Sequence, residues 1–577
     1  MLRSWMILVF ALSSSAPAAQ AVTVEHTFNV GTLSLPSICQ PGNTSTTAVN
    51  GRVPGPEIEA NEGDTVVVHV INDSPYNVTV HWHGVFQRGT PWADGPAMVT
   101  QCPIRPSRRY TYRFNVTGQE GTLWWHAHSS FMRATVHGAL VVRPRQGAGE
   151  YPFPRPDEEK TVLLGEWWNA DTVLLERQAF LAGGSIASAD AYTINGEPGD
   201  LYDCHTKMNR IARFQMRRGS TYLLRIINAA LNTAFFFKVA GHTLTVVAAD
   251  ASYTAPYDTD VVVIAPGQTV DALMAADASP GCYYMAISSY QSAGVLRPGS
   301  FNGNVTTAVV EYVGEAAPSK QNAPALPAMP ALNATAVAHR FYTSLTALVR
   351  PGSPTVPLAV DTRMFVTVGL GFSSCEPEQT SCNRSAGVVA ATMNNVTFAL
   401  PTTVSMLDAR HRNEAGGVYT RDFPDEPPVA FDYTNERLSS SPALSSTGRP
   451  ATKVRTLRYN ATVEMVLQNT ALVGRESHPM HLHGFNFFVL AQGFGNYDGV
   501  AAAEQLNLVN PQERNTVAVP TGGWAVIRFV ANNPGMWFMH CHIDAHLAIG
   551  LAMVFDVEDG PTPDTALPPP PADLPQC

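Results

Sequence analysis

Four His-x-His pairs constrain what this chain can fold into more than any other feature of its sequence. They use eight of the 17 histidines: His81 and His83, His126 and His128, His481 and His483, and His540 and His542. Successive side chains of a β-strand point to opposite faces of a sheet, so residues i and i+2 share a face. Each pair therefore predicts a strand that presents two imidazoles in one direction. Two pairs lie toward each end of the chain, so they can form one site only if the two end regions pack together.

The last pair brackets a cysteine, Cys541, and His546 follows it four residues later; one more histidine, His478, precedes the third pair. On a strand, the two histidines of His540-Cys541-His542 face one way and the thiol faces the other. This tripeptide can therefore join two metal sites through a few covalent bonds.

Copper is the metal that this ligand set favours. A structural zinc site needs only four ligands, which ten histidines and a cysteine exceed several times over. Imidazole-rich sites suit copper, and His478, Cys541 and His546 make up the His₂Cys set of a blue-copper electron-transfer site. The eight paired histidines suffice for three further copper ions. Four copper ions in total would match the four electrons that reduce dioxygen to water.

Composition and patterning predict an all-β protein of several domains. The chain has 577 residues, of which 43 are glycine and 44 proline, and a chain this long is expected to form more than one domain. Short apolar segments that predict strands are 65–70, 109–116, 161–164, 222–227, 261–264 and 526–530. Comparable segments end at Asn72, Asn228 and Asn469. This internal similarity predicts three β-sandwich domains, at 22–150, 151–320 and 321–577. The last would include a surface excursion at 407–452 and a proline-rich C-terminal arm.

The N-terminus predicts export. Arg3, the apolar run 5–12 and the small residues Ala19-Gln20-Ala21 form a signal peptide over residues 1–21. The apolar run is too short to span a bilayer, and no later segment is long and apolar enough, so we expect a secreted protein without a membrane partner. Nine Asn-x-Ser/Thr sequons fit an exported glycoprotein. The formal net charge of −10 argues against nucleic-acid binding. We expect a monomer.

With these features the chain resembles a multicopper oxidase, and within that family a plant-type laccase. The motifs are HWHGV (81–85), WADGP (92–96), TQCPI (100–104), GTLWWHAHSS (121–130), HPMHLHGFNFFVLAQGFGNYD (478–498) and NPGMWFMHCHIDAHLAIGLAM (533–553). The resemblance covers nearly the whole chain, down to the terminal LPQC. It implies three cupredoxin-like Greek-key β-sandwiches that hold four copper ions.

The resemblance also assigns the ligands, which spacing alone cannot do. It gives the type 1 copper to His478, Cys541 and His546, and the type 2 copper to His81 and His481. One type 3 copper takes His83, His126 and His542, and the other takes His128, His483 and His540.

Three further residues gain roles from the resemblance. Asp94 is expected near the type 2 copper, where it would supply protons to reduced oxygen; the alternative is an ordinary turn aspartate. Leu551 is expected at the axial position of the type 1 copper, and Ile543 on its opposite side. Periodicity alone does not exclude Met553, which would share a strand face with Leu551. Loss of an axial thioether should raise the type 1 potential.

Other expectations are less specific. The resemblance pairs Cys102 with Cys577 and Cys39 with Cys204, which leaves Cys282 as a free thiol, and Cys375 is close enough to Cys382 for a local disulfide. Asn232 is either a neutral hydrogen-bonding residue near the donor or a turn residue. The seven remaining histidines are expected to be ordinary surface or core residues: His26, His69, His137, His205, His242, His339 and His411.

The resemblance implies a secreted laccase. It would take single electrons from small phenols through an exposed edge of His546 and reduce dioxygen to two waters, in lignin or other phenolic metabolism. Ascorbate oxidase is the nearest alternative, although it usually carries an axial methionine. A ferroxidase would need acids beside His478 and His546, and Asp544 is the only nearby acid that the sequence suggests. A cupredoxin-like protein without metals is disfavoured because all four histidine pairs are intact.

Overall fold

The structure is a computed structural model that describes residues 21–577 apart from 146–150, 185, 203–209, 280, 293–303, 314–323, 386, 436, 439–440, 471 and 475. Cys204, His205 and all of the predicted signal peptide except Ala21 therefore lie outside the described residues. The predicted all-β class is confirmed: six β-sheets form three pairs that follow one another along the chain.

The first pair of sheets, which we call the first unit, is built from residues 23–143. Its sheets, in spatial order, are β2 (Asn43–Val49), β1 (Thr23–Pro36), β4 (Thr65–Asn72) and β6 (Arg108–Asn115), and β3 (Ile58–Asn61), β8 (His137–Arg143), β7 (Gly121–Ala127) and β5 (Val80–His83). Two short 3₁₀ turns, η1 (Pro91–Ala93) and η2 (Ser130–Ala134), follow β5 and β7.

The second unit is built from residues 158–313. Its sheets are β10 (Ala191–Ile194), β9 (Glu158–Trp167), β12 (Thr221–Asn228), β17 (Thr269–Ala275), β14 (Leu244–Ala249) and β15 (Ser252–Thr259), and β11 (Ala212–Arg217), β19 (Thr306–Val313), β18 (Cys282–Tyr290), β13 (Ala234–Val239) and β16 (Val262–Ile264). Helix α1 (Thr172–Ala182) lies between β9 and β10, and Asp171 caps its N-terminus by accepting from the amides of Val173 and Leu174. Helix α2 (Thr335–Ser344) follows the second unit.

The third unit is built from residues 362–557. Its sheets are β21 (Val388–Met393), β20 (Thr362–Ser373), β23 (Thr462–Asn469), β28 (Gly523–Val530), β25 (Phe487–Phe494) and β26 (Gln512–Arg514), and β22 (Val454–Leu457), β30 (Ala552–Val557), β29 (Gly535–Cys541), β24 (His478–Leu482) and β27 (Thr516–Val519). Four short helices accompany them, α3 (Met406–His411), α4 (Pro442–Ser445), α5 (Gly499–Ala503) and α6 (Asp544–Leu547), and a 3₁₀ turn, η4 (Pro563–Thr565), lies in the C-terminal arm.

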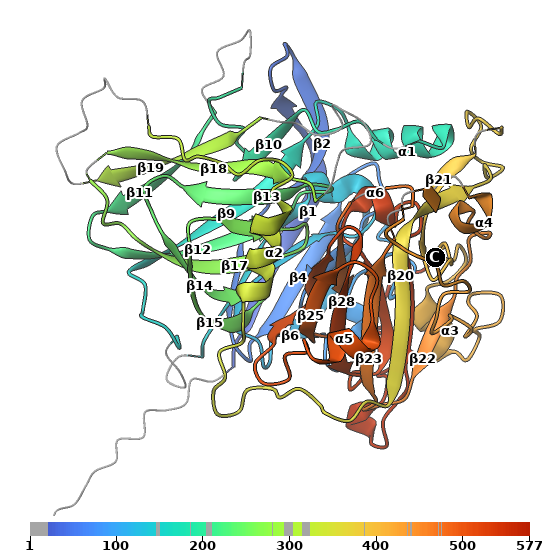
Figure 1. The fold of residues 1–577 in the computed structure, drawn as a ribbon. Helices are drawn as coiled ribbons and strands as arrows, with labels where there is room; N and C mark the ends of the chain where they lie inside the picture. The colour runs from blue at the N-terminus through green and yellow to red at the C-terminus, as the bar shows by residue number, and fades with distance from the viewer. Residues whose placement is uncertain are drawn as a thin grey trace, which may run out of the picture.

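The first and third units share a hydrophobic core. The buried cluster around Trp82 and Trp125 of the first unit also contains Met536 and Phe538 of β29. Figure 1 shows the blue strands of the first unit between the green strands of the second and the yellow-to-red strands of the third. The histidine strands of the two ends of the chain are therefore packed together, as the four pairs require.

A buried asparagine at the end of one strand in each unit explains the internal similarity of the sequence. Asn72, Asn228 and Asn469 end β4, β12 and β23 and have no exposed surface. Each Nδ2 donates to two backbone carbonyls, those of Tyr76 and Ile104, of Thr233 and Ile264, and of Glu476 and Val519 respectively. The repeated side chain therefore closes equivalent loops.

One segment differs in part from its prediction. Residues 407–452 are predicted to be a surface excursion, and most of the described residues after α3 are exposed, but α3 at its start is buried in the core of the first unit. The amides of Met406 and Leu407 donate to the carbonyls of Met98 and Val99 at 3.0 and 2.8 Å. The start of the segment is buried because packing the apolar side chains of α3 into this core removes their surface from water.

Candidate copper centre

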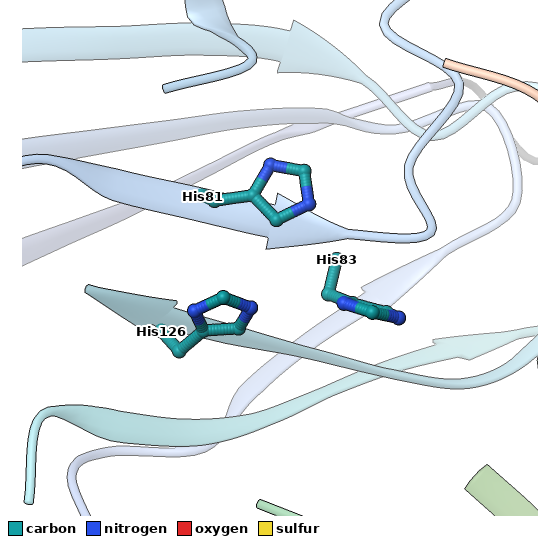
Figure 2. Close-up of side chains that lie close together, drawn as sticks. All are labelled: His81, His83 and His126. Carbon is teal, nitrogen blue, oxygen red and sulfur yellow. The ribbon is translucent and has the colours of Figure 1, made fainter. Parts of the chain in front are cut away.

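Strand pairing brings the histidine pairs together two by two. β5 and β7 are antiparallel with His81 opposite His126, and β24 and β29 are antiparallel with His481 opposite His540. Figure 2 shows His81 and His83 on one strand and His126 on its neighbour, with the three rings close together.

The two pairs of strands then meet, and all eight paired histidines lie in one cluster. His83 Nδ1 lies 3.1 Å from His542 Nε2, and His483 Nε2 lies 3.1 Å from His540 Nε2. His128 Nε2 lies 3.4 Å from His540 Nε2. Seven of the eight are buried, and His128 is half-buried. Within each of two sets, the donor atoms lie within 4.8 Å of one another. One set is His81, His83 and His126, and the other is His128, His483 and His540.

The ring nitrogens that point out of the cluster are held by acceptors. His81, His126, His481 and His540 each direct Nδ1 at a backbone carbonyl, at 2.7, 2.9, 2.9 and 2.9 Å. The Nε2 atoms of His81, His126 and His481 are buried and have no hydrogen-bond partner among the described residues. Such an arrangement fixes the tautomer that leaves an unprotonated nitrogen for a metal.

Burial also favours the ligating form of these side chains. It lowers the pKa of His83, His126 and His483 well below the ordinary value, because the charged imidazolium loses its hydration. Neutral imidazole is the form that binds metals. The cluster therefore fits the three copper ions that the sequence predicts for it.

A second site lies around Cys541. Its Sγ is 3.7 Å from His478 Nδ1 and 3.6 Å from His546 Nδ1, and all three side chains are buried. Burial alone would lower the pKa of His546, but hydrogen bonds with Cys541 and Glu476 raise it to about 10. The Glu476 carboxylate and Cys541 therefore favour a positive charge here, and a bound cation would take the place of the proton, because only neutral imidazole ligates a metal.

Leu551 is joined to this site through the backbone. Its carbonyl accepts from the amide of Cys541 and its amide donates to the carbonyl of His546, both at 3.0 Å. Met553 lies opposite Met539 in the β29–β30 pairing, two residues farther along the strand from Cys541. Ile543 is buried in the same apolar cluster as Cys541 and Leu551. These contacts favour Leu551 over Met553 as the side chain beside the metal.

One expectation about His546 is wrong. Asp544 is not the only nearby acid, since Glu476 Oε2 lies 2.9 Å from His546 Nε2. The His546 imidazole itself is largely buried, with 5% of the residue accessible. Glu476 stands two residues before His478, ahead of the first residue of β24, so strand alternation does not place its side chain.

Asp94 contacts two cluster histidines. Its Oδ2 accepts from His483 Nδ1 at 2.9 Å and its Oδ1 lies 3.3 Å from His81 Nδ1. Oδ1 has no hydrogen-bond partner among the described residues, and Asp94 is fully buried. The next residue, Gly95, has φ +99° and a Cβ there would lie 1.9 Å from the carbonyl oxygen of Val80. Only glycine lets this loop approach β5 closely enough to place Asp94 there.

The sequence reasoning missed a buried arginine, Arg133 of η2. Its Nη1 lies 2.8 Å from His542 Nδ1 and 3.2 Å from Asp544 Oδ1. Its Nη2 donates to the carbonyls of Leu231 and His542 at 3.1 and 3.0 Å. Arg133 thus joins all three units beside the cluster. Nothing in the spacing of histidines signals it, because the contact depends on how the units pack.

A cavity of about 430 Å³ reaches the cluster from one side. His126, His128 and Arg133 line its inner part, together with Glu176 of α1 and Asp544 of α6. Phe180, Val389 and Leu400 line it as well and are 42%, 38% and 45% exposed. His128 is only half-buried, and it lines this cavity.

Among the described residues, the other cysteines, Asn232 and the remaining histidines lie outside the two proposed copper sites. Disulfides join Cys102 to Cys577 and Cys375 to Cys382, and Cys282 is free, as predicted. Cys39 is disulfide-bonded, but its predicted partner Cys204 lies outside the described residues. Asn232 Oδ1 accepts from the amide of Ala545 at 3.1 Å, next to His546. The other described histidines belong to no group of possible metal ligands: His26, His69, His137, His242, His339 and His411.

Three β-sandwich units with a histidine cluster and a His₂Cys site are typical of a multicopper oxidase, and comparison with known families gives the same class. Family models described as multicopper oxidase match residues 35–147, 158–315 and 422–561. The chain belongs to the multicopper oxidase family, and it is a copper-binding protein on that ground.

Within the multicopper oxidase family, the chain is similar to proteins named laccases. The chain is 77% identical to Laccase-6 of Oryza sativa subsp. japonica over all of both sequences. It is 53% identical to Laccase-7 of Arabidopsis thaliana, with 99% of this chain and 98% of the relative covered. Among solved structures, laccase from Botrytis aclada is similar with a TM-score of 0.71 and 25% identity, covering 96% of this chain and 90% of that one.

Proposed function

We propose that the chain is a secreted laccase that oxidises small phenols one electron at a time and reduces dioxygen to two waters. The observation that carries the oxidase function is the meeting of the Cys541 site and the eight-histidine cluster through one tripeptide, His540-Cys541-His542. The donor class is supported by the relatives, which are named laccases. Lignin or another pool of plant phenolics would be the natural source of donors.

The two sites would hold four copper ions. His478, Cys541 and His546 would hold the type 1 ion, and Leu551 and Ile543 would supply the apolar surroundings of that site. His81 and His481 would hold the type 2 ion. The type 3 ions would take His83, His126 and His542, and His128, His483 and His540. When bound, the copper ions supply one-electron transfer at Cys541 and four-electron reduction of dioxygen at the cluster.

Glu476 would be the residue that meets the donor. Its side chain is 32% exposed while that of His546 is only 6% exposed, so a phenol reaches the carboxylate before the imidazole. The carboxylate accepts from His546 Nε2 and can accept from a phenol hydroxyl as well, because each carboxylate has two acceptor oxygens. The donor would therefore be oriented toward His546 by Glu476.

Asp94 and the cavity would serve the oxygen end. The unpartnered Oδ1 of Asp94 can hold a proton or a water beside the cluster, which suits delivery of protons to reduced oxygen. The cavity gives dioxygen a way in and water a way out at His128. Arg133 keeps the cavity end of the cluster ordered through its contacts with His542 and Asp544.

Secretion, glycosylation and a monomeric state remain part of the proposal. The predicted signal peptide supports secretion, and no helix in the described part of the chain is long and apolar enough to cross a membrane. We further propose that the three units correspond to domains 22–150, 151–320 and 321–577.

Two experiments test the function. Steady-state rates of the purified enzyme with syringaldazine, ascorbate and Fe(II) should favour the phenol; preference for ascorbate or Fe(II) would replace the laccase assignment with one of its alternatives. Cys541→Ser should abolish the blue absorption, whereas Cys282→Ser, which removes the other free thiol of the described residues, should retain it. An unchanged spectrum in Cys541→Ser would contradict the type 1 assignment.

A further inference from the structure

The second unit supplies none of the proposed copper ligands. Between residues 158 and 313 the described part of the chain contains one histidine, His242, which bonds to Tyr312 and Ala240 instead. Even so, the loop between β16 and β17 contacts the cluster, and the turn after β14 contacts residues 514–516, which lie against it. Their contacts indicate what this unit does for the site.

Gly267, in the loop between β16 and β17, packs against a cluster histidine. Its φ is +90°, and a Cβ built on it would lie 2.8 Å from Cγ and 2.9 Å from Cδ2 of His542. Arg133 lies against the same ring, with Nη1 at 2.8 and 3.4 Å from its two nitrogens. The position of the His542 ring, which follows the last residue of β29, is therefore fixed by these two neighbours.

The same loop also contacts Trp124, whose ring packs against two cluster histidines. The carbonyl of Gly267 accepts from Trp124 Nε1 at 3.3 Å, and the Trp124 ring lies 4.4 Å from that of His126 and 5.1 Å from that of His83, centroid to centroid. The next residue, Gln268, donates from Nε2 to the carbonyl of Thr516 at 3.0 Å.

Asp250, after β14, holds the segment that orients two more histidines. Its Oδ2 accepts from Arg514 Nε at 2.8 Å and from the amides of Asn515 and Thr516 at 3.3 and 3.2 Å. The carbonyl of Asn515 accepts from His481 Nδ1 at 2.9 Å, and its side-chain Oδ1 lies 3.1 Å from His83 Nε2. Asp250 is 1% exposed, so its carboxylate is committed to these contacts.

We propose that Asp250, Gly267 and Gln268, which we call the second-unit buttress, are positioning residues for the trinuclear cluster. The buttress fixes His542, His481 and His83 in the arrangement that retains copper, and it leaves the Cys541 site untouched. This inference rests on the proposed copper cluster. Partners that orient metal ligands typically contribute about 10- to 100-fold to metal affinity, and the buttress residues are of this kind.

Gly267→Ala tests the proposal, with Gly219→Ala as its matched control. Gly219 lies in the same unit, has φ +83° and has nothing within 4 Å of a Cβ. Both variants meet the same backbone strain, but only Gly267→Ala places a methyl group against His542. Full-length enzyme is compared by copper content, blue absorption, the electron paramagnetic resonance signal of type 2 copper, and copper retention against a chelator.

Gly267→Ala is expected to keep the blue absorption and to release cluster copper about tenfold or more readily than the wild type, while Gly219→Ala matches the wild type. Wild-type copper retention and spectra in Gly267→Ala would overturn the proposal. So would equal loss of blue and cluster copper. A wild-type enzyme that binds no cluster copper would instead overturn the proposed function.

A second pair of variants applies if Gly267→Ala does not fold. Asp250→Asn removes the charge that holds Arg514 and the Asn515 segment, and Asp260→Asn removes an exposed acid of the same unit whose side chain is 71% accessible. Asp250→Asn should shift the type 2 signal and weaken cluster copper selectively, and Asp250→Glu should partly restore both. No change in Asp250→Asn relative to Asp260→Asn would overturn the proposal.

Discussion

At the scale of single residues, two carboxylates mark the two ends of the proposed electron path. Asp94 lies against the cluster with one oxygen unpartnered among the described residues, and Glu476 lies against His546 at the surface. They differ in burial, since Asp94 is fully buried and the Glu476 side chain is 32% exposed. The first suits a proton carrier and the second a contact for the donor.

Asp94→Asn is expected to slow oxygen uptake by about 10²- to 10⁴-fold, the usual contribution of a positioned acid or base. The amide keeps the shape of the side chain but cannot carry the proton. Anaerobic bleaching of the blue absorption by a phenol should keep its rate, because the Cys541 site is unchanged. Asp73→Asn, at an exposed site of the same unit, is the control; unimpaired oxygen uptake in Asp94→Asn would exclude the proton role.

Glu476→Gln is expected to raise the KM for a neutral phenol about fivefold with little change in kcat. Hydrogen bonds to a charged acceptor contribute roughly 1 kcal/mol more than those to a neutral one. An anionic donor should gain instead, because the negative charge beside His546 is removed. Steady-state kinetics with one donor of each charge provide the measurement, and parallel changes for both donors would contradict the assignment.

The convergence of the paired histidines on one site could be predicted from sequence, because strand alternation and the His-x-His spacing carry that geometry, whereas their division among copper ions came from the family resemblance. Glu476 could not be placed by alternation, because it lies before the first residue of β24. Arg133 and Asp250 could not be predicted either, because the histidines that they help to position lie hundreds of residues away and on another unit. Contacts of that kind depend on how whole sheets pack, which residue spacing does not encode.

At the scale of elements, the strand-end asparagines are the repeated device of the fold. Asn228 of β12 donates to two buried carbonyls and accepts from the amide of Ala230 at 3.0 Å. The sequence showed the repeat as a faint similarity, and the structure shows its cause. The predicted strands at 65–70, 222–227 and 526–530 are likewise confirmed within β4, β12 and β28.

Asn228→Ala should destabilise the protein by about 2–4 kcal/mol, since it leaves buried carbonyls and an amide without partners. Denaturant unfolding followed by tryptophan fluorescence measures the loss. Asn532→Ala, at an exposed position, should be nearly neutral. A similar loss in both variants would show that the buried bonds are not the cause.

Asn72 is also the asparagine of a sequon, and its burial predicts that it carries no glycan. Its Nδ2 is engaged with Tyr76 and Ile104 and has no exposed surface. The other sequon asparagines are exposed: Asn43, Asn77, Asn115, Asn304, Asn333, Asn383, Asn395 and Asn460. Glycopeptide mapping of the secreted protein should find glycans only among these eight, and a glycan on Asn72 in folded protein would refute the structural role.

At the scale of the whole molecule, the copper cluster joins the first and third units. Each proposed copper ion of the cluster draws ligands from both, so bound metal stabilises their packing by mass action. Removal of copper with a chelator should therefore lower the thermal midpoint measured by calorimetry, and readdition should restore it. A midpoint that does not respond to copper would mean that protein contacts alone hold the units together.

The division of the cluster between two units has a consequence for the order of events in the cell. Residues 81–128 supply four of its histidines and residues 481–542 supply the other four. A nascent chain can fold its first unit early, but the proposed copper pocket lacks half of its ligands until β29 and His542 have been synthesised. We therefore expect metal to be loaded only after the third unit has been made, and a product that stops short of β29 cannot become an oxidase.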